Sequence, residues 1–128
     1  MMKKGFTLLE LIVVIIILGI LATLGFSQYM KMVEKGRSAE ARMILGQIRT
    51  AQETYKLEYG SYASAIGSLP VDAPTGCLTT HYFNYSAGSA NGVATRCSSG
   101  GKTPNATTGY TITLIYSTGV WGGTAGYY

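Results

Sequence analysis

One acidic side chain, Glu10, stands inside an otherwise apolar stretch near the start of the chain. From Leu11 to Phe26 only Thr23 interrupts the apolar character. A charged side chain in a segment that spans a bilayer costs roughly 2.5–3.5 kcal/mol on insertion scales. We therefore expect Glu10 to have a function and a partner that compensates its charge.

Cys77 and Cys97 are the only cysteines, and both lie in the C-terminal half. An isolated pair without the spacing of metal ligands predicts a disulfide, which is typical of oxidising compartments such as the periplasm or the cell surface. A bridge that closes this loop would contribute roughly 3 kcal/mol in the chain-entropy model. Two buried free thiols are the alternative. Zinc is not expected, because His81 is the only histidine and no third cysteine is present.

The sequence after Asp72 offers little further chemistry, because it contains no acidic residue. It therefore lacks paired carboxylates for hydrolysis and acidic ligands for calcium. His81 has serines nearby but no third member of a nucleophilic triad. No glycine-rich loop is followed by the Lys-Ser/Thr pair of a phosphate site. We predict that the protein is not an enzyme and needs no cofactor.

The formal net charge of +4 is too small to predict nucleic-acid binding by itself. Arg96 and Lys102 are the only Lys or Arg residues after Asp72. With nearby tyrosines they could hold single-stranded DNA by charge and stacking. Two cations make a weak case, so nucleic acid is not an expected partner.

The apolar stretch has the length of a membrane-spanning helix, since the 21 residues from Phe6 to Phe26 would extend about 30 Å. A secretory signal peptide would have a core of only about 7–15 residues, without a carboxylate, and a small-residue cleavage site. A plain membrane anchor would explain the length but would leave Glu10 unexplained. Both alternatives therefore fit less well than a segment with a second role.

The residues from Lys4 to Val14, with Gly5, Phe6, Thr7 and Glu10 at the edge of the apolar run, resemble the N-terminus of type IV pilins and pseudopilins. This resemblance implies that a prepilin peptidase removes residues 1–5 by cutting after Gly5. Phe6 would then be N-methylated. Glu10 would be the glutamate that sets subunit register during assembly.

Elementary electrostatics agrees with these implied roles. Cleavage before Phe6 would create an ammonium group four residues from Glu10, which is a neighbour spacing on a helix. A carboxylate in an apolar environment either takes up a proton or finds a cation. In the family the amine is thought to belong to an adjacent subunit, so that Glu10 acts as a registration device.

Residues 27–62 predict an amphipathic continuation of the helix. Apolar and aromatic residues recur at spacings of three and four, and we expect them in the core: Ala41, Ile44, Ile48, Ala51, Tyr55, Tyr59 and Tyr62. Gly60 is a plausible C-terminal cap, so the simplest prediction is one helix from about Phe6 to Tyr59. Many pilins have a proline where this chain has Ser27. Gly25 weakens the helix there by only about 1 kcal/mol relative to alanine.

Residues 63–128 predict a globular, β-rich head. Residues 63–72 read as a connecting loop with at most one helical turn. The segment Tyr110–Tyr116 is the strongest strand candidate, and Val120-Trp121 begins a return strand. Weaker strands are expected at 82–86 and 93–97. We predict an α+β fold in which an antiparallel sheet packs on the long helix, as the resemblance also implies.

Three functions share these features. The leading hypothesis is a homo-oligomeric type IV pilus subunit, and the alternatives are a type II secretion pseudopilin and a DNA-uptake pilin. The precursor would be a single-pass inner-membrane protein with its head in the periplasm, and its destination an extracellular pilus or a periplasmic pseudopilus. Basic residues flank the apolar run on both sides, so charge alone leaves the orientation open; they are Lys3, Lys4, Lys31, Lys35 and Arg37.

Overall fold

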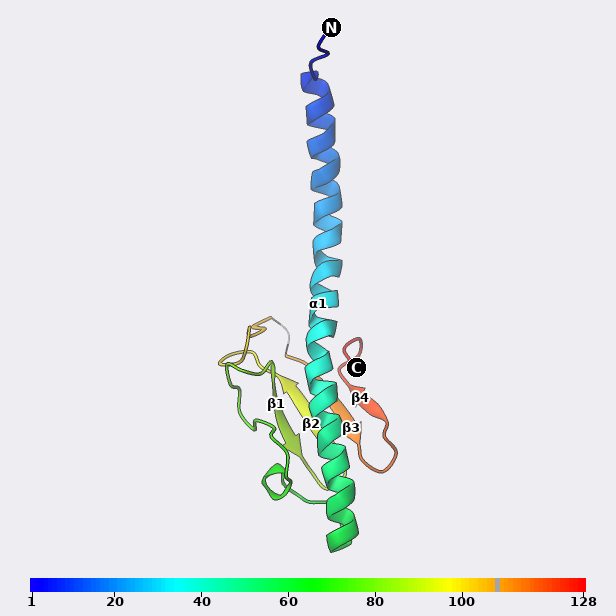
Figure 1. The fold of residues 1–128 in the computed structure, drawn as a ribbon, viewed down its shortest axis with the longest axis vertical. Helices are drawn as coiled ribbons and strands as arrows, with labels where there is room; N and C mark the ends of the chain where they lie inside the picture. Colours follow the sequence, from blue (N-terminus) through cyan, green and yellow to red (C-terminus); the bar gives the residue numbers. More distant parts are fainter. Residues whose placement is uncertain (108) are drawn as a thin grey trace. The chain divides into compact units, whose positions relative to one another are not determined.

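The computed structural model of this protein describes residues 1–107 and 109–128. A long helix precedes a single turn of 3-10 helix and a four-stranded sheet (Figure 1). The strands follow one another in the order β1-β2-β3-β4, and each neighbouring pair is antiparallel. The elements are α1 (Leu8–Tyr59), η1 (Ile66–Ser68), β1 (Phe83–Ala87), β2 (Asn91–Arg96), β3 (Thr111–Ile115) and β4 (Trp121–Gly123). The predicted α+β fold class is confirmed.

The chain divides into two compact units, residues 1–34 and residues 35–128, which we call the N-terminal unit and the globular unit. In the N-terminal unit every residue as far as Met32 is exposed. α1 continues without a break through Gly25. The hydroxyl of Thr23 donates to the Gly19 carbonyl oxygen at 2.6 Å, and that of Ser27 donates to the Leu24 carbonyl oxygen at 3.3 Å.

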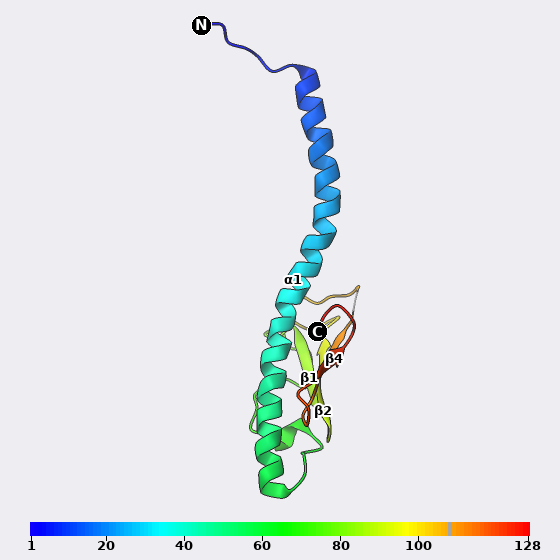
Figure 2. The same ribbon diagram turned by 90° about the vertical axis from the view of Figure 1, so that its right-hand side faces the viewer.

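In the globular unit, residues 35–59 of α1 lie along one face of the sheet (Figure 2). Buried and less buried positions alternate along the strands, so one face of the sheet supplies the core. The helix brings a buried apolar stripe to this face. The main core residues are Ala41, Ile44, Leu45 and Ile48 from α1 and Phe83, Tyr85, Ala94, Ile112 and Leu114 from the strands. Each unpartnered apolar face is thereby covered by the other.

The predicted strand positions agree with the structure to within one or two residues at most ends. The prediction for Tyr59 was wrong, because its side chain is 66% exposed at the end of α1. Gly60 adopts a φ of +80°, and its N–H donates to the Lys56 carbonyl oxygen at 2.8 Å. The helix therefore stops at Tyr59, and Tyr62 packs against the core from the following loop.

Two polar side chains of α1 also bind the sheet and its loops. The Oε1 atom of Glu40 accepts hydrogen bonds from the Tyr82 N–H at 3.0 Å and from the Tyr85 hydroxyl at 3.2 Å. Burial raises the pKa of Tyr85, and the neighbouring charge and hydrogen bond of Glu40 raise it further. Arg49 donates from Nε to the Tyr116 carbonyl oxygen at 2.9 Å. These contacts fix how the helix lies over the strands.

Gln52 is fully buried, and it holds the loop that follows the helix. Its Oε1 accepts from the Ala63 N–H at 2.8 Å, and its Nε2 donates to the Ala63 carbonyl oxygen at 3.0 Å and to the Gly88 carbonyl oxygen at 3.4 Å. The Tyr116 hydroxyl is buried close to this amide. It makes no hydrogen bond of normal geometry within the described residues, and burial raises the pKa of Tyr116.

Candidate functional site

The first turn of α1 is closed by a reciprocal pair of side chains. Thr7 immediately precedes the helix, and its N–H and its hydroxyl both donate to Oε2 of Glu10 at 2.9 Å. The Glu10 N–H donates in return to Oγ1 of Thr7 at 3.3 Å. This is a capping box, in which a threonine at the N-cap and a glutamate three residues later satisfy backbone donors at the helix start.

Sequence reasoning had treated Glu10 only as an assembly residue and had missed this local role. The signal was present, because Thr7-Leu8-Leu9-Glu10 is the capping-box pattern immediately before an apolar run. Both hydrogen bonds that the Glu10 carboxylate accepts from Thr7 go to Oε2, so Oε1 takes no part in the capping. Glu10 can therefore cap its own helix and still present an oxygen to a second partner.

The surroundings of Glu10 are apolar and exposed. The large side chains from Leu8 to Phe26 are between 40% and 75% exposed. By length and composition alone, α1 could cross a membrane. Because so much apolar surface is unfavourable in water, lipid or other protein must cover this part of the helix.

The bond between Gly5 and Phe6 lies before the helix begins. Neither residue belongs to a helix or strand, and both are exposed. Exposed backbone outside helices and strands is accessible to a peptidase, and this bond lies in such a segment. The capping pair Thr7 and Glu10 begins directly on the C-terminal side of this bond.

The structure joins Cys77 to Cys97 by a disulfide, with a Cα–Cα distance of 5.8 Å. Cys97 directly follows β2 and is buried, whereas Cys77 lies in the loop before β1. Gly101 packs against this bridge. A Cβ at Gly101 would overlap the Cys97 Cβ, so a larger residue would not fit without a backbone shift. The bridge thus ties the loop before β1 to the end of β2.

Arg96 is part of the core and was wrongly considered for DNA contact. Its side chain is only 2% exposed. Nη1 donates to the carbonyl oxygens of Tyr82 and Cys97 at 3.0 and 3.3 Å, and Nη2 donates to that of Thr103 at 2.7 Å. Its guanidinium therefore organises the loops around the disulfide and is not available to a phosphate backbone. Lys102 is exposed, with its Nζ 4.9 Å from the centre of the Tyr82 ring.

Metal binding finds no support in the part of the chain that the structure describes. No group of three or more His, Cys, Asp or Glu side chains there is placed to hold an ion. His81 bonds through Nδ1 to the Thr80 hydroxyl at 2.8 Å.

Comparison with known proteins identifies the N-terminal segment. Residues 1–26 match the model of the prokaryotic N-terminal methylation motif. Over 71 residues the chain is 36% identical to the type IV major pilin protein PilA of Myxococcus xanthus. The matched region is 53% of this chain and 32% of that protein. Over 76 residues it is 38% identical to the type II secretion system core protein G of Pseudomonas aeruginosa. That matched region is 58% of this chain and 54% of the relative. The methylation motif and these two similarities support the type IV pilin and pseudopilin family.

A third relative, the fimbrial protein EcpC of Eikenella corrodens, is 31% identical over 93 residues, which are 73% of this chain and 61% of EcpC. The chain thus spans between about a third and three-fifths of the length of these relatives. These relatives are named as pilin, fimbrial and secretion-system core proteins, which agrees with the prediction that the chain is not an enzyme.

Proposed function

We propose that this pilin-family protein is a structural subunit of a type IV pilus-like filament, made as a membrane precursor. Its leader, residues 1–5, is removed after Gly5, and the new N-terminal Phe6 is methylated. The observation that carries the proposal is an exposed apolar segment, residues 6–26, of which Leu8 onward is helical, with Glu10 near its start and in the register of the methylation motif.

The physical role of this helix follows from what can cover it. In the precursor the bilayer covers the apolar side chains, and in the filament the helices of other copies replace the lipid. Glu10 opposes insertion and favours a site where a cation is present. The ammonium of a processed Phe6 is such a cation, and Oε1 of Glu10 lies outside the capping bonds and can receive it. Because this pair forms at one stagger only, it sets the register between subunits.

Localisation follows the same proposal. The precursor is a single-pass protein of the inner membrane, and its globular unit faces the periplasm. The bond between Cys77 and Cys97 supports this orientation, because disulfides persist in oxidising compartments. A prepilin peptidase and a pilus or secretion assembly machinery are the partners that this route requires.

A pseudopilin of a type II secretion system is the second candidate. The similarity to core protein G extends over 54% of that protein in Pseudomonas aeruginosa, compared with 32% of the Myxococcus pilin. The first turn of α1 would act in the same way in either assembly. A DNA-uptake pilin receives no support, since the burial of Arg96 leaves Lys102 as the one exposed lysine or arginine among the described residues after Asp72.

Two experiments test the proposal. Glu10→Ala should insert into the membrane but fail to form ordered filaments, as seen by electron microscopy of sheared cell-surface material. Thr23→Ala is the matched control, because it removes a polar side chain from the same helix. The hydroxyl of Thr23 donates to the Gly19 carbonyl oxygen within that helix. Normal filaments from Glu10→Ala would refute the register role.

Mass spectrometry tests the processing. The intact mass of assembled subunits should correspond to the loss of residues 1–5 and the gain of one methyl group on Phe6. Filaments whose subunits retain Met1 would refute the cleavage. Long surface fibres favour the pilus, whereas loss of protein secretion without surface fibres, on deletion of the gene, favours the pseudopilus.

A further inference from the structure

A groove lies beside α1 at the edge of the globular unit that β4 forms. Its volume is about 270 Å³, and it is lined by Lys35, Ser38, Ala39 and Arg42 of α1 and by Tyr127 and Tyr128. The Arg42 guanidinium lies over the Trp121 ring of β4, 5.8 Å from its centre. The Tyr127 ring stacks on the ring of the buried Tyr110, with 4.0 Å between the centroids. Packing therefore positions both walls of the groove.

The charge of this groove favours an anion. Both charged residues that line it, Lys35 and Arg42, are basic and exposed. They are seven residues apart, which is nearly two helical turns, so both side chains leave α1 on the same side, with the small Ala39 between them. Among the described residues, neither forms an ion pair with an acidic group. We call this surface the basic groove, and it suits a carboxylate, because guanidinium and ammonium groups bind carboxylates by charge-assisted hydrogen bonds.

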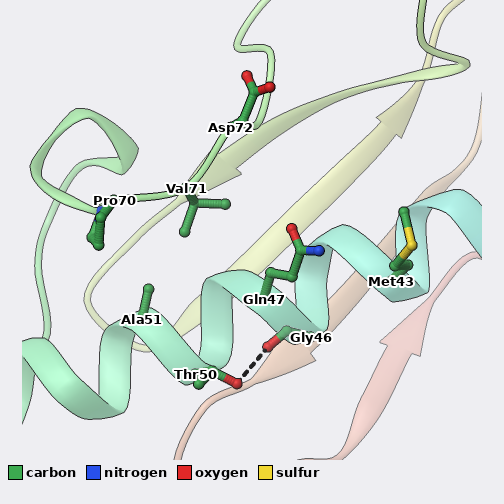
Figure 3. A pocket seen from close by; sticks show the side chains of 8 residues that line it. All are labelled: Met43, Gly46, Gln47, Thr50, Ala51, Pro70, Val71 and Asp72. Atoms are coloured by element: carbon green, nitrogen blue, oxygen red, sulfur yellow. Dashed lines mark hydrogen bonds between the residues drawn. The ribbon is translucent and has the colours of Figure 1, made fainter.

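The globular unit has two exposed acidic side chains among its described residues, Glu58 and Asp72. The carboxylates of Glu40 and Glu53 are half-buried and accept hydrogen bonds from tyrosine hydroxyls. Figure 3 shows that Asp72 points away from α1, and no hydrogen bond or ion pair holds its carboxylate within the described part of the chain. This carboxylate is therefore available to another molecule.

Asp72 and the basic groove lie on opposite flanks of α1. Asp72 lines a separate hollow, together with residues of α1 between 43 and 51. Two residues further on, the Pro74 carbonyl oxygen accepts from the Tyr85 N–H of β1 at 2.8 Å, so this loop runs beside the β1 edge. β1 and β4 are the two outer strands, and Figure 1 shows them on opposite sides of α1. Because the helix separates them, a chain cannot place its own Asp72 in its own basic groove.

We propose that the basic groove binds the Asp72 carboxylate of a second copy of this chain, between Lys35 and Arg42. The contact is heterologous, because the β1 flank of one copy meets the β4 flank of the next. Heterologous contacts that do not close into a ring produce open helical assemblies. Since every copy has both flanks, the same contact repeats along the assembly.

The length of α1 favours Asp72 over Glu58 as the bound group. Residues 35–59 of α1 extend about 36 Å at 1.5 Å per residue. The α1 residues that line the hollow with Asp72 centre on Gln47, eight residues from Ala39, so parallel copies joined through Asp72 are offset by about 12 Å and stay largely side by side. Glu58 is 19 residues from Ala39, so its pairing would offset the copies by about 28 Å and leave little overlap.

Charge reversal tests this inference, which rests on the proposed function because it assigns a contact within the filament. Asp72→Lys should lower the yield of sheared filaments about tenfold, since a third cation would meet Lys35 and Arg42. Adding Lys35→Glu and Arg42→Glu to that variant should restore the yield, because the charges are then exchanged. Glu58→Lys is the matched control and should stay within about twofold of the unchanged chain. A normal yield from Asp72→Lys, or an equal loss from Glu58→Lys, would overturn the contact.

Cysteine crosslinking provides a second measurement that does not depend on yield. Filaments of the double variant Ala39→Cys and Asp72→Cys should, after oxidation, run as a ladder of multimers on a non-reducing gel, because each copy is joined to the next through two different surfaces. Ala39→Cys with Glu58→Cys is the matched control and should give no ladder. Monomers only from the first pair, an equal ladder from the control pair, or crosslinks only to another protein would overturn the contact alone. Failure of the unmodified chain to form any filament would instead overturn the proposed function.

Discussion

The buried amide of Gln52 gives the sharpest test of how the globular unit is held together. Gln52→Met retains the length of the side chain and removes its hydrogen bonds. The N–H and the carbonyl oxygen of Ala63, which is 3% exposed, then lose the partners that lie at 2.8 and 3.0 Å. A buried polar group without a partner costs about 1–3 kcal/mol.

Because two such groups lose their partners, the free energy of unfolding should fall by about 2–6 kcal/mol. The greater hydrophobicity of the methionine side chain offsets part of this loss. We expect the free energy of unfolding to fall by about 3 kcal/mol. At about 1.5–3 kcal/mol per molar urea, the unfolding midpoint should move down by about 1–2 M. Fluorescence of Trp121, the only tryptophan, reports unfolding of the full chain in detergent micelles.

Gln47→Met is the matched control, because it makes the same chemical change five residues earlier on the exposed side of α1. Its urea midpoint should stay within about 0.3 M of the unchanged protein, as surface substitutions usually have small effects. Equal midpoints for Gln52→Met and Gln47→Met would refute the conclusion that Gln52 holds the loop at Ala63.

Four further variants address the core, the disulfide and the response to alkali. Tyr116→Phe should leave the free energy of unfolding unchanged or raise it by about 1 kcal/mol, because the buried hydroxyl has no hydrogen-bond partner among the described residues; a loss of more than about 1 kcal/mol in urea would contradict this. Arg96→Met should lower the free energy of unfolding by about 3 kcal/mol or more, because three carbonyl oxygens lose a charged donor. A urea midpoint equal to that of the unchanged protein would show that Arg96 does not hold these loops. Replacing both Cys77 and Cys97 by serine should cost about 3 kcal/mol and make thermal unfolding insensitive to dithiothreitol, whereas a melting temperature that matches the oxidised protein would refute the estimate. Burial, aided by an adjacent carboxylate, raises the pKa of Tyr85 in the folded protein, so the stability that depends on its neutral phenol is fully present below about pH 10 and falls as the pH rises further. Tyr85→Phe should flatten that alkaline loss in urea titrations from about pH 9.5 to 11.5, and an unchanged slope would rule Tyr85 out as its source.

The pattern of residues was sufficient for most of the fold. Period-three and period-four spacing predicted the buried positions Ala41, Ile44 and Ile48 on α1. β-branched and aromatic residues predicted a strand at Tyr110–Tyr116, and the structure has it at Thr111–Ile115. These signals are local, because neighbours in sequence determine which face of a helix or strand is apolar. Tyr59 was misplaced for the same reason, since periodicity continues to the helix end whether or not the sheet reaches that far.

Buried polar residues were beyond the reach of this reasoning. Gln52 and Arg96 look like surface residues in the sequence, and both are buried. Their partners are backbone carbonyl oxygens of distant loops, such as Ala63, Gly88 and Thr103. Burial of a polar group is favourable only when such partners surround it, and no local pattern records which loops will come together.

Local sequence was enough to identify the apolar N-terminal segment and its methylation motif, because the apolar length, the one carboxylate and the spacing of Gly5, Phe6, Thr7 and Glu10 are all local properties. Only the packed globular unit shows that Arg96 and Gln52 are buried residues whose partners are carbonyl oxygens of distant loops. The physical reason is the range of the interactions. Helix capping and bilayer insertion act over a few turns of one helix, whereas a buried guanidinium or a groove exists only after segments far apart in the chain have packed together.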